Sequence, residues 1–329
     1  MNTAEVVKNA MLGIAVGDAL GSPVEFKYKY ENISAGEERS RFLKDPVTTM
    51  LPRFGQERDY IKPPGTFTDD TSMTLATADS IAKKGIDYDD MMKRFLAWLH
   101  NDDYTTDGRF GAGGTTKAAL KKYADGTPAL QSGMSESTAN GNGSIMRIFP
   151  AAIYNIKLND LKNKQVMDNI GALTHAHPIS IISCGIYGKV LQSIMDKNTR
   201  PQDLSEAVKS ALAYYAEQYP GHIHHFERLT NPRFLNTKEH DISSGGYVLD
   251  TLESALWCYL NTDNFKDCAV KAVNLGGDSD STASVAGGLA AITYGAKSIP
   301  DEWMEILRGK EMINEISENF SKKLEEIGK

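Results

Sequence analysis

Apolar residues recur at spacings of three and four along most of the chain, which is the period of an α-helix with one buried face. The pattern predicts helices at residues 6–20, 91–100, 180–195, 248–260 and 265–275. A stretch of small and apolar residues at 282–296 is too short to cross a membrane and predicts a helix buried in the core. Most of the chain is therefore expected to form amphipathic or buried helices.

Strict alternation of apolar and polar residues, the mark of a half-buried strand, is nearly absent. Turn-rich segments separate the predicted helices at residues 27–66, 101–114, 124–144 and 219–246. None of them has the composition of a flexible linker, and the chain contains no internal repeat. We therefore predict an all-α protein with a single domain over residues 1–329 and long functional loops.

Composition narrows the class of protein further. The 329 residues are 41% hydrophobic and 24% charged, as in a globular protein with a sizeable core. The 36 basic and 43 acidic residues leave a net charge of −7, and no dense basic run predicts nucleic-acid binding. The first 22 residues match neither a signal peptide nor a membrane span, and the three cysteines are scattered. We expect a monomeric cytoplasmic protein with reduced thiols.

Two adjacent aspartates stand at the start of a predicted helix in the segment GTFTDDTSM, residues 65–73. A local interpretation is a helix cap. Thr68 would cap the helix, and its dipole would favour Asp69 and Asp70 by about 0.3–1 kcal/mol each. The residues of this segment alone favour that interpretation.

A second segment, GGDSDST at residues 276–282, repeats the same chemistry, with Asp278 and Asp280 beside hydroxyl side chains such as Ser281. If the two segments meet in space, their carboxylates and hydroxyls form the all-oxygen ligand set that hard divalent cations prefer. No Cys/His pattern typical of zinc accompanies them. The pair of segments therefore predicts a site for two Mg²⁺ or Mn²⁺ ions.

Two other interpretations of the second segment fail. DSDST fits the DxDxT pattern of aspartate-nucleophile phosphatases, but it follows two glycines and a helical pattern, where that motif requires a buried strand. An EF-hand loop counted from Asp278 would need Gly at its sixth position and Glu at its twelfth, and the chain has neither.

Glycine-rich turns precede two further predicted helices. In GRFGAGGTTKAAL, at residues 108–120, backbone N–H groups and a helix N-terminus can converge on an anion such as a diphosphate, or the glycines form a plain turn. The segment ANGNGSIMR, at 139–147, allows a close backbone approach to a ligand or another turn. Glu25 either faces a cleft or is solvated, and His175 either contacts a ligand or caps a helix. The residues alone leave these alternatives open.

The chain resembles the ADP-ribosylglycohydrolases, the family of the dinitrogenase reductase-activating glycohydrolase and the ADP-ribosyl-acceptor hydrolases. The resemblance covers nearly the whole chain. It rests on seven segments that follow one another in the order of the family, namely GIAVGDALGSPVEF, GTFTDDTSM, GAGGTT, GNGSIMR, THAHP, GYVLDTLESALWC and GGDSDST. It implies a compact orthogonal bundle of helices with a binuclear Mg²⁺ or Mn²⁺ cleft.

The resemblance also implies roles for individual residues. The positions that match metal ligands of the family are Thr68, Asp69, Asp70, Asp278, Asp280 and Ser281. The positions that match its substrate-binding loops are Gly111, Ala112, Gly113, Gly114 and Thr115 for the diphosphate, Asn142, Gly143 and Ser144 near the ribose, and His175. Glu25 matches an acid that acts in catalysis or gating in one branch, and we take Glu25 and Asp280 as the candidate catalytic residues.

One position departs from the family pattern. In the nitrogenase-regulating branch an acid with part of the catalytic role is expected at the position of Gly111, which leaves Glu25 as the first candidate for proton transfer. The expected reaction is hydrolysis of the bond between ADP-ribose and an acceptor, first of all a protein arginine. Two alternatives are hydrolysis of O-linked (serine) or small-molecule conjugates, and a protein that binds ADP-ribose without catalysis.

Overall fold

The computed structural model describes residues 2–26, 47–51, 53–54, 61–158, 164–197 and 204–327. The α-helices are α1 (Thr3–Gly21), α3 (Asp69–Lys84), α4 (Tyr88–Asn101), α5 (Gly114–Ala124), α6 (Ala129–Ser132), α7 (Phe149–Leu158), α8 (Lys164–Ala172), α9 (Pro178–Lys197), α10 (Leu204–Gln218), α11 (Glu227–Thr230), α12 (Val248–Leu260), α13 (Phe265–Asn274), α14 (Ser279–Tyr294), α15 (Asp301–Ile306) and α16 (Lys310–Ile327). The one sheet among these residues is a two-stranded antiparallel ribbon of β1 (Arg53–Phe54) and β2 (Ile61–Lys62). The predicted all-α class is confirmed.

Two of the predicted irregular segments also contain short helices. The segment 124–144 contains α6, and 219–246 contains α11 and the 3₁₀ helices η5 (Pro220–Phe226), η6 (Phe234–Asn236) and η7 (Glu239–Asp241). The prediction of wholly irregular structure there is wrong, because helices of three to seven residues are too short to show a 3.6-residue period. Much of the segment 27–66 lies outside the described residues.

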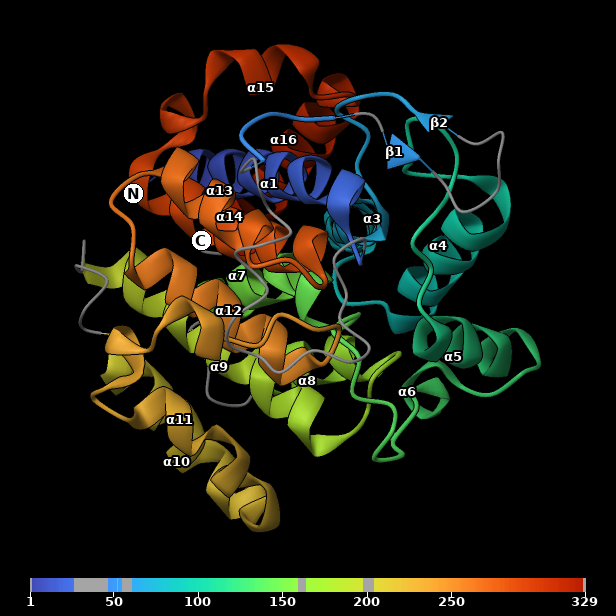
Figure 1. Ribbon diagram of the computed structural model, residues 1–329. Coiled ribbons are helices and arrows are strands. Elements are labelled where there is room, and N and C mark those ends of the chain that lie inside the picture. Colours follow the sequence, from blue (N-terminus) through green and yellow to red (C-terminus); the bar gives the residue numbers. More distant parts are fainter. Residues whose placement is uncertain are drawn as a thin grey trace.

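Helices α1 and α14 pack against each other at the centre of the molecule, with α3 beside them (Figure 1). Gly13, Gly17 and Gly21 lie four residues apart and therefore share one face of α1. A Cβ at Gly17 would overlap the carbonyl oxygen of Ala283, and a Cβ at Gly21 would lie 2.6 Å from the Asp280 Cα atom. The absence of side chains on this face thus allows backbone contact between the two helices.

The same packing sets helix ends against one another. The Ser279 hydroxyl at the start of α14 donates to the Gly21 carbonyl at the end of α1, at 2.9 Å. Helix α3 begins where the Thr68 hydroxyl accepts from the Asp70 N–H, and it ends at Gly85, which has a positive φ of 70°. The C-terminal end of α1 and the N-terminal ends of α3 and α14 therefore meet in one region.

None of the described helices combines the length and hydropathy that crossing a bilayer requires. The three cysteines, Cys184, Cys258 and Cys268, are buried and unbridged.

Candidate metal centre and ligand cleft

Asp18 fixes the position of the first acidic segment. It is fully buried within α1, and its carboxylate accepts hydrogen bonds from the Thr68 and Thr71 N–H groups at 3.0 Å and from the Thr71 hydroxyl at 2.6 Å. These donors lie at the start of α3, where N–H groups lack partners within the helix. Asp18 therefore holds the N-terminus of α3 against α1.

The two acidic segments predicted from the sequence meet at this junction. The Ser281 hydroxyl of α14 donates to Asp70 Oδ2 at 3.2 Å, across 211 positions of the chain. Carboxylate oxygens of Glu25, Asp278 and Asp280 lie within 4.8 Å of one another. The arrangement places acids from three helix ends around one space.

Electrostatics make this cluster costly when no cation is bound. Burial, together with the neighbouring charges of Glu25 and Asp18, raises the pKa of Asp69 well above its usual value. Burial is also the largest cause of the raised pKa values of Asp70 and Asp280, and the charges of nearby carboxylates raise both pKa values as well. Buried carboxylates without cations raise one another's pKa, so the cluster favours protons or metal ions as counter-charge.

The unused ligand atoms fit a divalent cation. The Oδ1 atom of Asp70 is buried and has no hydrogen-bond partner among the described residues. The Asp278 side chain makes no capping bond at the start of α14, although it occupies the position where aspartates commonly cap a helix. Carboxylate oxygens available in this way, with hydroxyl groups beside them, are the kind of donor set that Mg²⁺ or Mn²⁺ prefers.

Glu25 follows the 3₁₀ helix η1 (Ser22–Val24), at the end of α1. Its Oε2 atom lies 2.7 Å from Nη2 of Arg53, whose other terminal nitrogen donates to the Ser22 hydroxyl at 2.9 Å. The pKa of Glu25 is raised to about 7. Burial is the largest cause and the charge of Asp278 adds to it, whereas Arg53 acts in the opposite direction. Glu25 therefore faces the cleft, and the alternative of a freely solvated side chain is wrong.

The acids form one wall of a cleft of about 210 Å³. The predicted residues that line it are Glu25, Asp69, Asp70, Gly111, Gly113, Gly114, Thr115, Asn142, Gly143, His175, Asp278, Asp280 and Ser281. Three predicted residues do not line it. Ala112 packs against the core, Ser144 is fully buried at the start of η2 (Ile145–Arg147), and the Thr68 hydroxyl is directed to Asp70 Oδ2 at 3.3 Å.

Gly111 has no room for a side chain. Its φ is +84°, a backbone conformation that favours glycine, and a Cβ there would overlap Oδ1 of Asp69. The loop thus lies directly against the carboxylate of Asp69. With this backbone the chain cannot carry an acid at position 111.

The opposite wall consists of glycine-rich backbone and His175. Helix α5 begins at Gly114, and its N-cap, Gly113, makes no side-chain capping bond, so the first N–H groups of the helix remain available to a ligand. A Cβ at Gly143 would lie 2.7 Å from Cε1 of His175. The glycines therefore leave His175 accessible from the cleft.

Sequence patterns missed Asp18, Arg53 and Arg147 as supporting residues of the site. Asp18 carries a usable signal, because a lone aspartate inside an apolar helix must find partners. Arg53 and Arg147 were missed because the side chains that they contact, Glu25 and Thr174, are distant in sequence.

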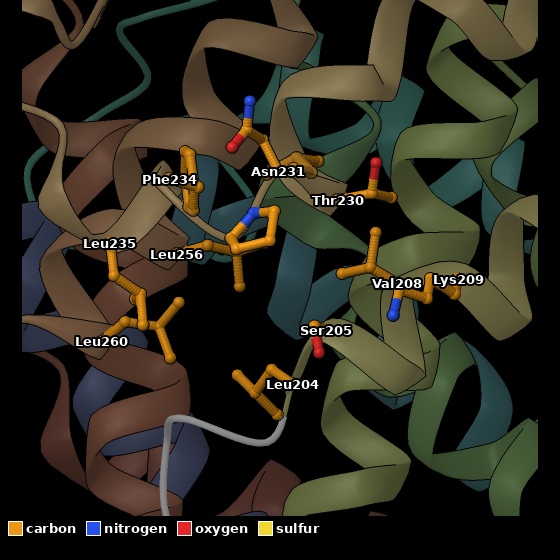
Figure 2. A pocket seen from close by; sticks show the side chains of 12 residues that line it. Leu204, Ser205, Val208, Lys209, Thr230, Asn231, Phe234, Leu235, Leu256 and Leu260 are labelled. Carbon is orange, nitrogen blue, oxygen red and sulfur yellow. The ribbon is translucent and has the colours of Figure 1, made fainter.

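A second pocket, of about 260 Å³, lies between α10, α12 and the segment 229–235. Figure 2 shows that apolar side chains, mainly leucines, line most of it. Its one ionisable lining residue, Lys209, is paired with Glu206 at 2.7 Å. This pocket lacks the converging polar groups of a catalytic site, so the acidic cleft is the candidate functional site.

Comparisons with known proteins agree with this geometry. A family model described as ADP-ribosylglycohydrolase matches residues 1–328. The chain is 30% identical over 319 residues to the ADP-ribosylarginine hydrolase Tri1 of Serratia proteamaculans (strain 568), covering 95% of this chain and 78% of the relative. It is 32% identical over 303 residues to a Rhodospirillum rubrum glycohydrolase named for ADP-ribosyl-dinitrogen reductase, covering 91% and 88%. A solved structure described as an ADP-ribosylglycohydrolase-related protein complex superposes with a TM-score of 0.71 at 26% identity, covering 98% of this chain and 99% of that one.

Proposed function

The chain belongs to the ADP-ribosylglycohydrolase family of enzymes, and from this premise we propose that it is a metal-dependent hydrolase that releases ADP-ribose from modified arginine side chains. The observation that carries the proposal is the acidic cluster with its unpartnered Asp70 Oδ1 atom. Such a cluster needs a counter-charge, and divalent cations are a common counter-charge for an all-oxygen donor set.

The residues that would hold two such ions are Asp69, Asp70, Asp278, Asp280 and Ser281, which line the cleft, and Thr68, which the family resemblance adds although it does not line the cleft. When bound, Mg²⁺ or Mn²⁺ supplies Lewis-acid polarisation and orients oxygen atoms of the substrate. Asp18 supports this arrangement, because its carboxylate fixes the N-terminus of α3, from which Asp69 and Asp70 extend.

Glu25 is suited to proton transfer during cleavage of the glycosidic bond. Its carboxyl lines the cleft, and before metal ions bind, burial raises its pKa to about 7, so it can both donate and accept a proton near neutral pH, as this reaction requires of one group. The Arg53 guanidinium fixes one of its oxygens at 2.7 Å and keeps the carboxyl at the edge of the cluster.

The remaining walls suit the ADP-ribosyl group. The N–H groups at the start of α5 and the adjacent Gly111–Thr115 backbone offer donors to a diphosphate. Asn142 and Gly143 line the neighbouring part of the cleft, where the distal ribose would lie between the diphosphate loop and the acids.

Arginine is the first choice of acceptor because Tri1, at 30% identity, is named as an ADP-ribosylarginine hydrolase. The second candidate is hydrolysis of O-linked conjugates. It is favoured by Gly111, because the family resemblance leads us to expect an acid at this position in the nitrogenase-regulating branch and this chain has none.

A panel of substrates tests the proposal and separates these acceptors. With Mg²⁺ present, we expect the protein to release ADP-ribose from ADP-ribosylarginine faster than from an ADP-ribosylserine peptide, and Asp280→Ala to abolish release while circular dichroism stays helical. Turnover of the serine conjugate alone would replace arginine as acceptor. Calorimetric binding of ADP-ribose without turnover of any conjugate would identify a binding protein instead of an enzyme.

A further inference from the structure

The buried guanidinium of Arg147 links two loops of the cleft. Arg147 is fully buried in η2, and its Nε donates to the Gly143 carbonyl at 3.0 Å. On the other side, its terminal nitrogens donate to the Ile170 carbonyl at 3.2 Å and to the Thr174 hydroxyl at 2.8 Å. The ring of Phe95 lies 4.7 Å from the guanidinium carbon. One side chain thus spans the loop of Gly143 and the loop that precedes His175.

The hydrogen bond from Arg147 to Thr174 determines which atom donates in the hydrogen bond between Thr174 and His175. Thr174 Oγ1 lies 2.8 Å from Nδ1 of His175. An arginine can only donate, so the Thr174 oxygen accepts from Arg147 and keeps its own proton to give. Nδ1 of His175 is the acceptor available to that proton, which makes Nδ1 the unprotonated nitrogen of the ring.

The opposite direction is unfavourable. If His175 Nδ1–H donated to Thr174, the Thr174 hydroxyl would accept twice and its own proton would need another acceptor. Thr174 is fully buried, and the described part of the chain offers its hydroxyl no further partner. A buried donor left unpaired costs about 1–3 kcal/mol, which selects the first arrangement.

The second nitrogen of the ring reaches the ligand cleft. His175 lines the cleft, and a Cβ at Gly141 or Gly143 would lie 3.5 or 3.2 Å from Nε2. Burial and the Arg147 charge lower the pKa of His175 to about 3, so the ring is neutral at physiological pH and carries one proton. With Nδ1 unprotonated, that proton resides on Nε2.

We propose that Arg147 and Thr174 are positioning residues that hold His175 in the Nε2–H tautomer, so that it donates a hydrogen bond to an oxygen of the bound ADP-ribosyl group. This deepens the proposed function and rests on it for the identity of the ligand. His175 then acts as a fixed donor and takes no part in proton transfer, which distinguishes it from Glu25.

The tautomer can be read in the ligand-free protein by ¹⁵N spectra of histidine-labelled chain, with the His175 signals assigned from the His175→Gln variant. We expect Nε2 to be protonated and Nδ1 unprotonated in the unmodified protein. In Thr174→Val, which removes the donor to Nδ1, the spectrum should shift towards a mixture of tautomers, and Thr174→Ser should restore the original one. An Nδ1–H tautomer in the unmodified protein would overturn the inference even if the valine variant did not fold.

Ligand binding supplies the second readout. By calorimetry, Thr174→Val should bind ADP-ribose about tenfold more weakly, with Thr174→Ser close to the unmodified protein. Thr262→Val is the matched control, because the Thr262 hydroxyl is buried, bonds the Cys258 carbonyl at 2.8 Å and does not line the cleft. Unchanged affinity in Thr174→Val overturns the role of the donor. Failure of the unmodified protein to bind ADP-ribose contradicts the proposed function while the tautomer measurement still stands.

Discussion

At the scale of single residues, the acidic cluster links protonation to metal binding. Burial raises the pKa of Asp18 to about 6 and that of Glu25 to about 7, so both hold protons more tightly in the folded chain than in the unfolded one. Unfolding therefore releases protons. The contribution of these two groups to the free energy of unfolding is fully present below about pH 4 and is lost as the pH rises through about 6 to 7. The pKa values of the proposed ligands Asp69, Asp70 and Asp280 are raised in the same direction, so protons and divalent cations compete for the oxygens of these three carboxylates.

This competition predicts how metal ions stabilise the protein at different pH values. The increase in melting temperature on adding Mg²⁺ or Mn²⁺ should be large at pH 8 and small at pH 5, where protons already neutralise the cluster. Differential scanning fluorimetry measures it. Asp70→Asn should reduce the increment, whereas Asp125→Asn, in an exposed ion pair with Lys121, should not. An increment that is equal at both pH values contradicts the cluster as the binding site.

Gly111 permits a second test at the residue scale. In Gly111→Ala, the added Cβ would displace the Asp69 carboxylate, and we expect Mn²⁺ affinity to fall about tenfold, because ligand positions set affinity. Gly126→Ala is the matched control, since its φ of +99° imposes similar backbone strain with no atom within 4 Å of the new Cβ. Calorimetry compares the two variants. Equal loss in both would assign the effect to strain alone.

The sequence predicted some of these residues and missed others for a physical reason. Asp69, Asp70, Asp278 and Asp280 form local patterns of acids and hydroxyls at helix starts, which are visible without a structure. Asp18 acts on backbone groups 50 and 53 positions away, and no local pattern identifies such partners.

At the scale of elements, the bare face of α1 determines where the acids meet. Backbone contact of Gly13, Gly17 and Gly21 with α14 brings Asp18 of α1 close to Asp280 at the start of α14. The spacing of the glycines is visible in the sequence, but the sequence does not show that α14 is the helix that packs against them.

A methyl group on this face should separate the two helices. Gly17→Ala places a Cβ against the Ala283 carbonyl, which belongs to the backbone and cannot rotate away. We expect the free energy of unfolding, from urea titration, to fall by about 1–3 kcal/mol. Gly221→Ala, where no atom lies within 4 Å of the new Cβ, should change it by less than about 0.5 kcal/mol. Equal effects in the two variants would contradict the close contact of α1 and α14.

At the scale of the whole molecule, helical periodicity was sufficient to predict the all-α class, including the buried helix α14. It could not predict that α14 returns to α1, with Ser279 bonded to Gly21 across 258 positions. The proposed metal centre depends on this contact between α1 and α14, because neither acidic segment alone contains enough ligands for two ions. The shared chemistry of the two segments, and then the family resemblance, connected them before the structure did.

The central claim is that the acids of α3 and α14 form one catalytic metal centre. The most direct test is the rate of ADP-ribose release from ADP-ribosylarginine by chelator-treated protein, titrated with Mg²⁺ or Mn²⁺, for the unmodified chain, Asp70→Asn and Asp280→Asn. The account predicts no release without metal, recovery on titration, and at least about a 100-fold loss of rate in each variant. Full activity of the chelated protein, or normal turnover in both variants, would contradict it.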